Sequence, residues 1–209
     1  MIAYTSYLTD GRVRLEAESL VKWGYEVHFL TLKSGRRPQS FLMCGVRVIE
    51  LNVRKYRGKS KLFYLLSYLH FLARACVVGT WVFFRSRIKV IHVHNMPDVL
   101  VLAGFLPKLF GCKIILDIHD SVPETYAGKF GARSGRLFKL LSVEEHLCCL
   151  LADKIICVNH VQRETLVARG LPIDKLHTVI TMPTFPDGPA PKLKRDSGTT
   201  FRVVAQFRT

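Results

Sequence analysis

The stretch Lys113-Ile-Ile-Leu-Asp-Ile-His-Asp-Ser-Val-Pro-Glu124 decides how this chain can fold. It begins as an apolar run typical of a buried strand and ends in the polar side chains of His119, Asp120 and Glu124. In an open α/β sheet, ligands bind outside the carboxyl ends of the parallel strands. We therefore expect residues 119–124 to contain the functional site.

Strand-like and helix-like segments alternate on both sides of this stretch. Strands are expected over residues 2–7, 26–32, 46–51, 89–93, 113–118, 154–158 and 176–181, and helices over 11–23, 62–84, 98–110, 136–151 and 161–169. Glycines predict a loop between residues 119 and 135. This alternation predicts an α/β fold, a doubly wound parallel sheet of the Rossmann-like kind.

The chain length allows one sizeable core. With 209 residues, we expect one Rossmann-like domain over residues 1–182. Residues 183–200 are rich in proline and charge and are expected to be a linker, and residues 201–209 to be the first strand of a second, missing domain. The six cysteines form no CxxC pair, which favours a reducing, cytoplasmic compartment.

The charge of the chain predicts a polyanionic partner. A net charge of +15 attracts nucleic acid, anionic lipid headgroups or phosphorylated substrates. The basic residues cluster in 47–61 and 85–89, on either side of the apolar segment 62–84. This bracketing favours an anionic membrane surface over nucleic acid, with the protein peripheral at the membrane.

Residues 62–84 have the length of a bilayer span, but His70 and Arg74 stand near the middle of the segment. Three interpretations are open: a transmembrane helix, a helix lying partly on the domain and partly in the lipid interface, and a buried core helix. The composition favours the second over the first and does not separate it from the third.

Four segments follow one another in a characteristic order. They are Asp10-Gly-Arg-Val-Arg14 before a helix ending in Gly-Tyr-Glu-Val27, His92-Val-His-Asn-Met-Pro-Asp98, Asp117-Ile-His-Asp-Ser-Val-Pro-Glu124, and Ala152-Asp-Lys-Ile-Ile-Cys-Val158. From near Met1 to about Ile180, the chain resembles the N-terminal half of family 4 retaining glycosyltransferases with the GT-B fold. The resemblance implies two Rossmann-like domains facing a cleft, the first holding mainly the acceptor and the second the nucleotide-sugar. It implies no metal in catalysis and no cofactor beyond the nucleotide-sugar co-substrate.

The chain departs from the family pattern in two places. The family usually has an asparagine after the last strand of this domain, where this chain has Thr181-Met-Pro-Thr-Phe-Pro186. We also expect the second domain, with its Glu-x7-Glu motif, to be missing from this chain. We therefore expect the chain alone to transfer no sugar to its lipid-linked or glycan acceptor. A separate partner chain carrying the donor domain, with this chain as a non-catalytic membrane-docked subunit, is an alternative.

The resemblance implies catalytic roles for His119 and Asp120, beside the donor phosphate or a sugar hydroxyl. The alternatives are a structural histidine bonded to a backbone carbonyl and a carboxylate that caps the next turn. Glu124 is expected either to bind substrate or to stabilise the first turn of a helix. Arg12 is placed to clamp a phosphate, whereas Arg14 is better explained by a solvated helix face.

Asn95 and Asp98 end the strand that contains His92 and His94, and they are further candidates for substrate binding. The two histidines alternate along the strand, so their side chains are expected on one face. With His119 and Asp120 they can also be a zinc or manganese site, which makes a metal-dependent hydrolase the alternative function. Glu144 and Glu145 are adjacent on a helix and are expected to be solvated.

Overall fold

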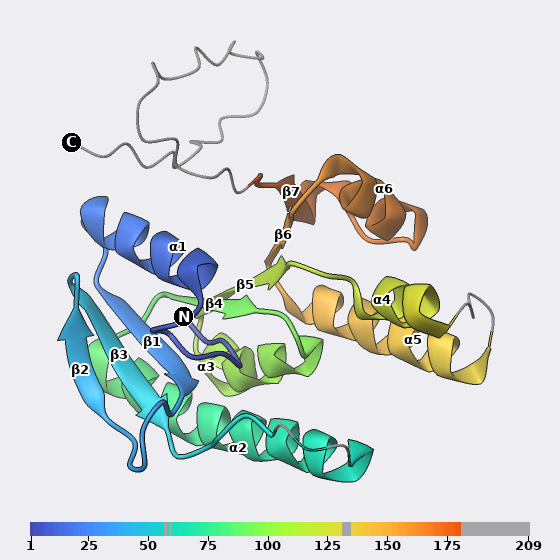
Figure 1. The fold of residues 1–209 in the computed structure, drawn as a ribbon. Helices are drawn as coiled ribbons and strands as arrows, with labels where there is room; N and C mark the ends of the chain where they lie inside the picture. Colours follow the sequence, from blue (N-terminus) through green and yellow to red (C-terminus); the bar gives the residue numbers. More distant parts are fainter. Residues whose placement is uncertain (57, 59, 131–134, 181–209) are drawn as a thin grey trace, which may run out of the picture.

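The computed structural model of the chain describes residues 1–56, 58, 60–130 and 135–180 (Figure 1). The elements in chain order are α1 (Gly11–Lys22), β1 (Val27–Leu32), β2 (Ser40–Met43), β3 (Val46–Leu51), α2 (Lys61–Ser86), β4 (Val90–His94), the 3-10 helix η1 (Asp98–Gly104), α3 (Phe105–Leu109), β5 (Lys113–Ile118), α4 (Val122–Phe130), α5 (Arg136–Leu151), β6 (Lys154–Cys157), α6 (His160–Ala168), the 3-10 helix η2 (Ile173–Lys175) and β7 (Leu176–Thr178). The expected linker 183–200 and strand 201–209 lie outside the described residues.

The strands form two groups that are linked through one residue. β1 pairs with β3 in parallel, β4, β5, β6 and β7 form a parallel series, and β2 is antiparallel to β3. Ile2 makes parallel bridges to Leu30 and Val93, so it lies between β1 and β4. The order is therefore β2-β3-β1, Ile2, then β4-β5-β6-β7, and the predicted doubly wound, Rossmann-like sheet is confirmed.

Helices cover both faces of this sheet. α1 packs over β1 and β3, and the side of α1 that carries Val13 and Ala17 is buried. The opposite face is covered by α2, η1, α3 and α5, which form one layer in Figure 1. The central strand β5 is buried between the two layers, which explains why residues 113–118 read as an apolar run.

The structure contains two elements that the sequence analysis did not predict. β2 occupies part of an expected loop, and a tight turn connects it to β3 because Cys44 and Gly45 both have positive φ, at 49° and 80°. α4 occupies the expected glycine loop between residues 119 and 135. Ser121 and Glu124 have the S-x-x-E spacing of a capping box, a signal for the start of α4 that the glycines concealed.

Two of the expected helices, those over residues 98–110 and 62–84, have features that the sequence left open. Residues 98–110 form η1 followed by the short α3. Gly104, at the end of η1, passes close to β5, and a Cβ there would lie 2.7 Å from Cδ1 of Ile114. In α2, one side is buried through Phe71, Ala75 and Val82. The other side of α2 is exposed, so this helix is not buried all round.

Candidate functional site

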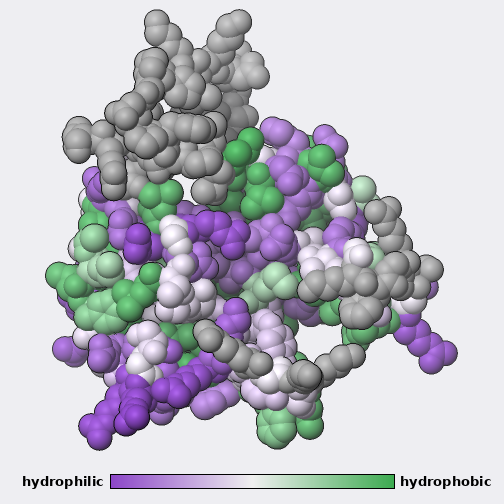
Figure 2. All heavy atoms as spheres, in the orientation of Figure 1, coloured by the Kyte–Doolittle hydropathy of each residue, from purple (hydrophilic) through white to green (hydrophobic). Residues whose placement is uncertain are grey.

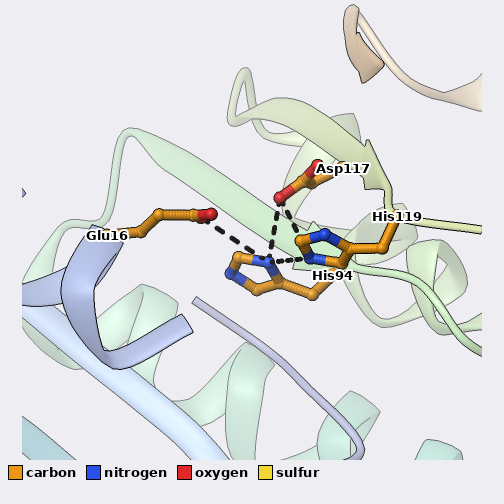
Figure 3. Close-up of side chains that lie close together, drawn as sticks. All are labelled: Glu16, His94, Asp117 and His119. Atoms are coloured by element: carbon orange, nitrogen blue, oxygen red, sulfur yellow. Dashed lines mark hydrogen bonds and ion pairs between the residues drawn. The ribbon is translucent and has the colours of Figure 1, made fainter. Parts of the chain in front are cut away.

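The polar side chains meet where β4 and β5 end. His94 is the last residue of β4 and pairs in register with Asp117 of β5, so both side chains lie on the same face of the sheet. His119 follows β5, and Glu16 reaches the group from α1 (Figure 3). These four side chains, contributed by three segments, form what we call the histidine–carboxylate cluster.

The contacts within this cluster are short. Oδ2 of Asp117 lies 3.1 Å from Nδ1 of His94 and 3.3 Å from Nε2 of His119. The two ring nitrogens are 3.3 Å apart, and Oε2 of Glu16 lies 3.7 Å from Nδ1 of His94. The ring of His92 stacks on that of His94 at 4.4 Å, which confirms that the two histidines share a face.

Burial sets the protonation states in the cluster. Burial lowers the pKa of His94 to about 3, with His92 adding to the effect, and burial also lowers the pKa of His119. Burial would raise the pKa of Asp117, but its interactions with His92 and His94 outweigh this and hold that pKa well below its usual range. Both histidines are therefore neutral at neutral pH, and Asp117 carries the negative charge.

Glu16 differs from Asp117 although both are carboxylic acids. Burial, reinforced by the charge of Asp117, raises the pKa of Glu16 to about 8. Glu16 is thus protonated at neutral pH and can donate a hydrogen bond. The cluster combines one ionised acid, one neutral acid and two neutral imidazoles, which is the kind of divided titration typical of functional sites.

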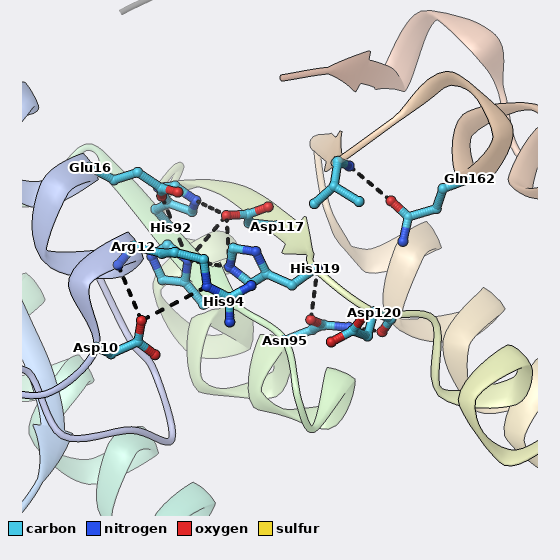
Figure 4. Close-up of polar contacts among 11 residues, drawn as sticks. Asp10, Arg12, Glu16, His92, His94, Asn95, Asp117, His119, Asp120 and Gln162 are labelled. Carbon is cyan, nitrogen blue, oxygen red and sulfur yellow. Dashed lines mark hydrogen bonds and ion pairs between the residues drawn. The ribbon is translucent and has the colours of Figure 1, made fainter. Parts of the chain in front are cut away.

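Asn95 holds the loop that carries His119 and Asp120 (Figure 4). Its Nδ2 donates to the backbone oxygen of Asp120 at 2.6 Å, and its Oδ1 accepts from the backbone N–H of His119 at 2.9 Å. The Asn95 N–H also donates to the Asp117 carbonyl oxygen at 2.9 Å. The described structure thus gives Asn95 a positioning role, and its predicted contact with substrate stays a prediction.

The other predicted residues divide into two groups. Asp120 is exposed directly beside the cluster, and Arg12 is exposed in the first turn of α1, where its charge contributes to the lowered pKa of His119. Arg14 forms an i,i+4 ion pair with Glu18 on the helix surface. Arg12 and Asp120 therefore belong to the same edge of the sheet as His119, as predicted.

Asp98 and Glu124 lie in different surroundings. The Asp98 side chain is 1% exposed at the start of η1, so it is buried, and its predicted contact with substrate stays a prediction. Glu124 lies in the first turn of α4, contacts Ser121 and forms an ion pair with Arg169. Its contacts fit the predicted stabilisation of a helix start, the second of the two roles considered for it.

The expectation that Glu144 and Glu145 are solvated is wrong. Glu145 is 1% exposed and forms an ion pair with Arg169, while Glu144 is half-buried. The reason is that α5 turns this side toward η1 and α4 and its apolar side outward. Charged residues usually lie on the solvent face of a helix. This rule does not hold for α5, because its apolar residues lie on the exposed side.

The cluster has a donor set that can hold a divalent cation. One ligand atom from each of Glu16, His94, Asp117 and His119 lies within 4.8 Å of the other three. This set differs from the predicted one because Glu16 and Asp117 take the places of His92 and Asp120. Each was missed for a reason: Asp117 reads as part of an apolar strand, and Glu16 comes from a helix distant in sequence.

Comparison with known proteins identifies the family. Residues 11–180 match the Glycosyl transferase 4-like domain. The chain belongs to this family. The sequence resemblance to family 4 glycosyltransferases is thereby confirmed, and the cluster lies at the carboxyl edge of a glycosyltransferase 4-like domain.

Solved structures share the fold of this chain. Sucrose-phosphate synthase from Thermosynechococcus elongatus has a TM-score of 0.61 at 18% identity, with 86% of this chain and 47% of that chain covered. A second structure of that enzyme gives a TM-score of 0.60 at 17% identity, covering 87% of this chain and 88% of that chain. A UDP-N-acetylglucosamine 2-epimerase gives 0.52 at 11% identity, covering 86% and 47%. No curated protein sequence matches the chain.

Proposed function

We propose that this chain is the acceptor-binding half of a glycosyltransferase, which transfers a sugar from a nucleotide-sugar to an acceptor held at a membrane. The observation that carries the proposal is the position of His119 in a family 4 domain. It stands at the carboxyl end of β5, where Asp117 and Asn95 hold it in place. Family membership alone leaves the substrates open.

The nucleotide-sugar is bound mostly outside the residues described here. The chain spans about half the length of the sucrose-phosphate synthase chain, with 47% of it covered. We propose that a donor-binding domain completes the site. That domain is either a continuation of this chain or a separate partner chain.

The contacts of His119 define the chemistry that it can supply. Asp117 is ionised and only accepts hydrogen bonds. The ring nitrogen of His119 that faces it, Nε2, therefore carries the proton of the neutral imidazole. Nδ1 then has the lone pair and accepts a hydrogen bond from a sugar hydroxyl. This assigns His119 to orient a hydroxyl, which replaces donation to the diphosphate as the expected interaction, because donation from Nδ1 requires a cationic ring that burial disfavours.

Arg12 and Asp120 complete the proposed constellation. Arg12 is exposed at the helix start and, when a phosphate of the donor approaches, can bind it through two parallel N–H groups. Asp120 is exposed and accepts hydrogen bonds from sugar hydroxyls. One cation and one anion next to a neutral imidazole suit a substrate that carries both phosphate and hydroxyl groups.

The experiment compares His119→Gln with His160→Gln in the enzyme that contains both domains. His160 is an exposed histidine at the start of α6, so it is a matched control. We expect His119→Gln to lower kcat/KM for sugar transfer by about 100-fold, since one positioned hydrogen-bonding group is worth about this much. Unchanged transfer by His119→Gln would refute the assignment.

The chain by itself provides a second test. Incubated with UDP- and GDP-sugars and a lipid-linked acceptor, the 209-residue chain is expected to form no product, because we propose that the donor is bound mainly by residues outside these 209. Sugar transfer by the purified chain alone would overturn the proposed division of the site between two domains.

A metal-dependent hydrolase is the second candidate, and the cation-competent donor set of the cluster is the observation that favours it. Metal analysis of the purified chain separates the two functions. Stoichiometric zinc or manganese, lost in Asp117→Asn, supports the hydrolase. Absence of bound metal after dialysis against either ion supports the glycosyltransferase.

A further inference from the structure

One long segment of the chain carries positive charge without any negative charge. Residues 51–97 contain no Asp or Glu. They contain nine basic residues, Arg54, Lys55, Arg57, Lys59, Lys61, Arg74, Arg85, Arg87 and Lys89. This segment includes the whole of α2, so the helix and both of its flanks attract anions.

The exposed side of α2 is apolar. The helix is long and apolar enough to cross a membrane. Only 17% of its most apolar 18-residue stretch is buried within the protein. Large hydrophobic side chains are exposed along its length: Leu62, Phe63, Leu65, Leu66, Leu69, Val77, Trp81 and Phe84. Arg74 and Arg85 are exposed on the same helix, and Arg85 lies over the ring of Trp81 at 5.7 Å. Apolar side chains flanked by arginines are typical of helices that lie in a membrane interface.

The apolar surface continues onto the neighbouring helices. The rings of Phe84 and Phe110 are 5.2 Å apart, which connects α2 with the end of α3. The exposed hydrophobic residues of η1 and α3 are Leu102, Phe105, Leu106 and Leu109, and those of α5 are Leu137, Leu140, Val143, Leu147 and Leu150. Figure 2 shows a small group of hydrophobic side chains at the bottom of the view, beside hydrophilic side chains at the lower left. Monomeric soluble proteins rarely expose so many apolar side chains on one layer.

This layer hides its acidic residues. Asp98 and Glu145 are buried, and Glu144 is half-buried, so the carboxylates of η1 and α5 do not face outward. α5 begins with the exposed Arg136 and Lys139. The outward charge of the layer is therefore positive.

α2 begins at the edge of the sheet where His119 lies, because it connects the carboxyl end of β3 to the amino end of β4. α5 follows α4 in the connection from β5 to β6, and Glu145 within α5 contacts Ser121, close to this edge. In Figure 1 both helices start on the side toward which β5 points. Of the exposed hydrophobic residues of α2, six lie in its first nine residues, between Leu62 and Leu69.

We propose that α2, η1, α3 and α5 form a docking surface that lies flat on an anionic lipid bilayer. The inference rests on the exposed apolar side chains of this layer and on its positive charge. It adds a defined surface and orientation to the membrane association expected from residues 62–84.

The packing of α2 favours docking over spanning. Phe71 and Ala75 are fully buried in the core that includes Leu30 and Leu51 of the sheet, and Val82 is almost fully buried. Moving α2 across a bilayer would remove these side chains from the core and expose their partners on the sheet. Lying in the interface keeps these contacts and covers the opposite side of the helix.

Charge favours a bilayer over a second copy of the chain. In a two-fold symmetric dimer the same surface meets itself, so the basic side chains of one α2 would face those of the other. Like charges in such a position repel, and the layer offers no outward carboxylate from η1 or α5 to compensate. Anionic headgroups supply the missing negative charge.

The test is co-sedimentation of the chain with vesicles of phosphatidylcholine containing about one third phosphatidylglycerol, at low salt. We expect binding that weakens as salt is raised, because the headgroup attraction is screened. Val77→Asp and Leu140→Asp are each expected to weaken binding by about tenfold, since each removes an apolar contact and adds a repelled charge. Arg85→Gln is expected to weaken it about fivefold at low salt only.

Val161→Asp is the matched control, because Val161 on α6 is 71% exposed and Val77 is 69% exposed. Circular dichroism establishes that each variant is folded. Loss of binding in Val77→Asp and Leu140→Asp but not in Val161→Asp supports the proposal. Absence of vesicle binding at low salt, equal loss in Val161→Asp, or a stable dimer that Val77→Asp dissociates would each overturn it.

The vesicle assay requires neither a nucleotide-sugar nor a donor domain. A chain that binds vesicles while the two-domain enzyme is unaffected by His119→Gln would refute the proposed role of His119 alone. If sugar transfer by the two-domain enzyme depends on His119 but the chain does not bind vesicles, only the docking surface is refuted.

Discussion

Nδ1 of His94 lies 3.1 Å from Oδ2 of Asp117, and both side chains are buried. The two residues come from neighbouring parallel strands and pair in register. This contact places an ionised carboxylate next to His119 without exposing it. Substitutions in the residues that form this contact can be tested by their effect on the free energy of unfolding and on amide exchange.

Asp117→Asn is expected to lower the free energy of unfolding by about 2 kcal/mol. The amide keeps the size of the side chain but loses the charge that accepts hydrogen bonds from both imidazoles, and hydrogen bonds to charged groups are worth about this much. Urea denaturation measures the change. Asp174→Asn, at an exposed position in η2, is the control and should leave stability within about 0.5 kcal/mol. Equal stability of the two variants would show that the cluster does not stabilise the domain.

Asn95→Ala is expected to loosen the loop that carries His119. The substitution removes the hydrogen bonds to the Asp120 carbonyl and from the His119 N–H. Amide exchange at His119 should accelerate by about tenfold, as expected for loss of roughly 1.4 kcal/mol of local stability. Asn52→Ala is the control, since Asn52 accepts a hydrogen bond from Lys33 away from the cluster. Unchanged protection at His119 would contradict the positioning role of Asn95.

Asp98 makes the stability of the domain depend on pH. Burial, with Glu144 nearby, raises the pKa of Asp98 from 3.8 to about 8. Between these values the folded state keeps a proton that the unfolded state releases, so the stabilising contribution of Asp98 is complete below pH 4 and falls as the pH rises toward 8. Asp98→Asn should flatten this fall, measured as Tm at pH 5 and pH 8. Glu16 acts in the same direction in both proteins, so the difference between them isolates Asp98. An unchanged slope in the variant would show that Asp98 is ionised when folded.

Arg169 joins α6 to α4 and α5 through its ion pairs with Glu124 and Glu145. Arg169→Met is expected to cost about 3 kcal/mol at pH 7, because it leaves the buried Glu145 without its partner. The cost should shrink at pH 5, where Glu145 can take up a proton, since burial already raises its pKa. Chemical denaturation at both pH values measures this.

Glu124→Gln is the comparison for Arg169→Met, because Glu124 is the exposed partner of the same arginine. An exposed ion pair contributes under about 1 kcal/mol, so this variant should be nearly as stable as the original chain. A larger effect of Glu124→Gln than of Arg169→Met would contradict the importance of the buried pair.

Much of the sheet could be read from the sequence because its strands are apolar runs of standard length. Residues 113–118 and 46–51 were predicted with the bounds that the structure has. β2 was missed because its turn uses Cys44 and Gly45 in place of the usual Asn-Gly, and positive φ at a cysteine is not a sequence signal. α4 was missed because the glycines near its end are typical of a loop, although the capping box at its start indicates a helix.

The sequence by itself determined the strand that delivers His119, the alternation that makes a doubly wound sheet, and the positive charge around α2. These are local properties, since each depends on residues close together in the chain. Only the tertiary structure decided that Glu16 and Asp117 join His94 and His119, that Asp98 and Glu145 are buried, and that α2, η1, α3 and α5 expose apolar sides on one layer. These features depend on which strands become neighbours and which helix face meets the sheet, because burial and charge interactions act between residues far apart in the chain.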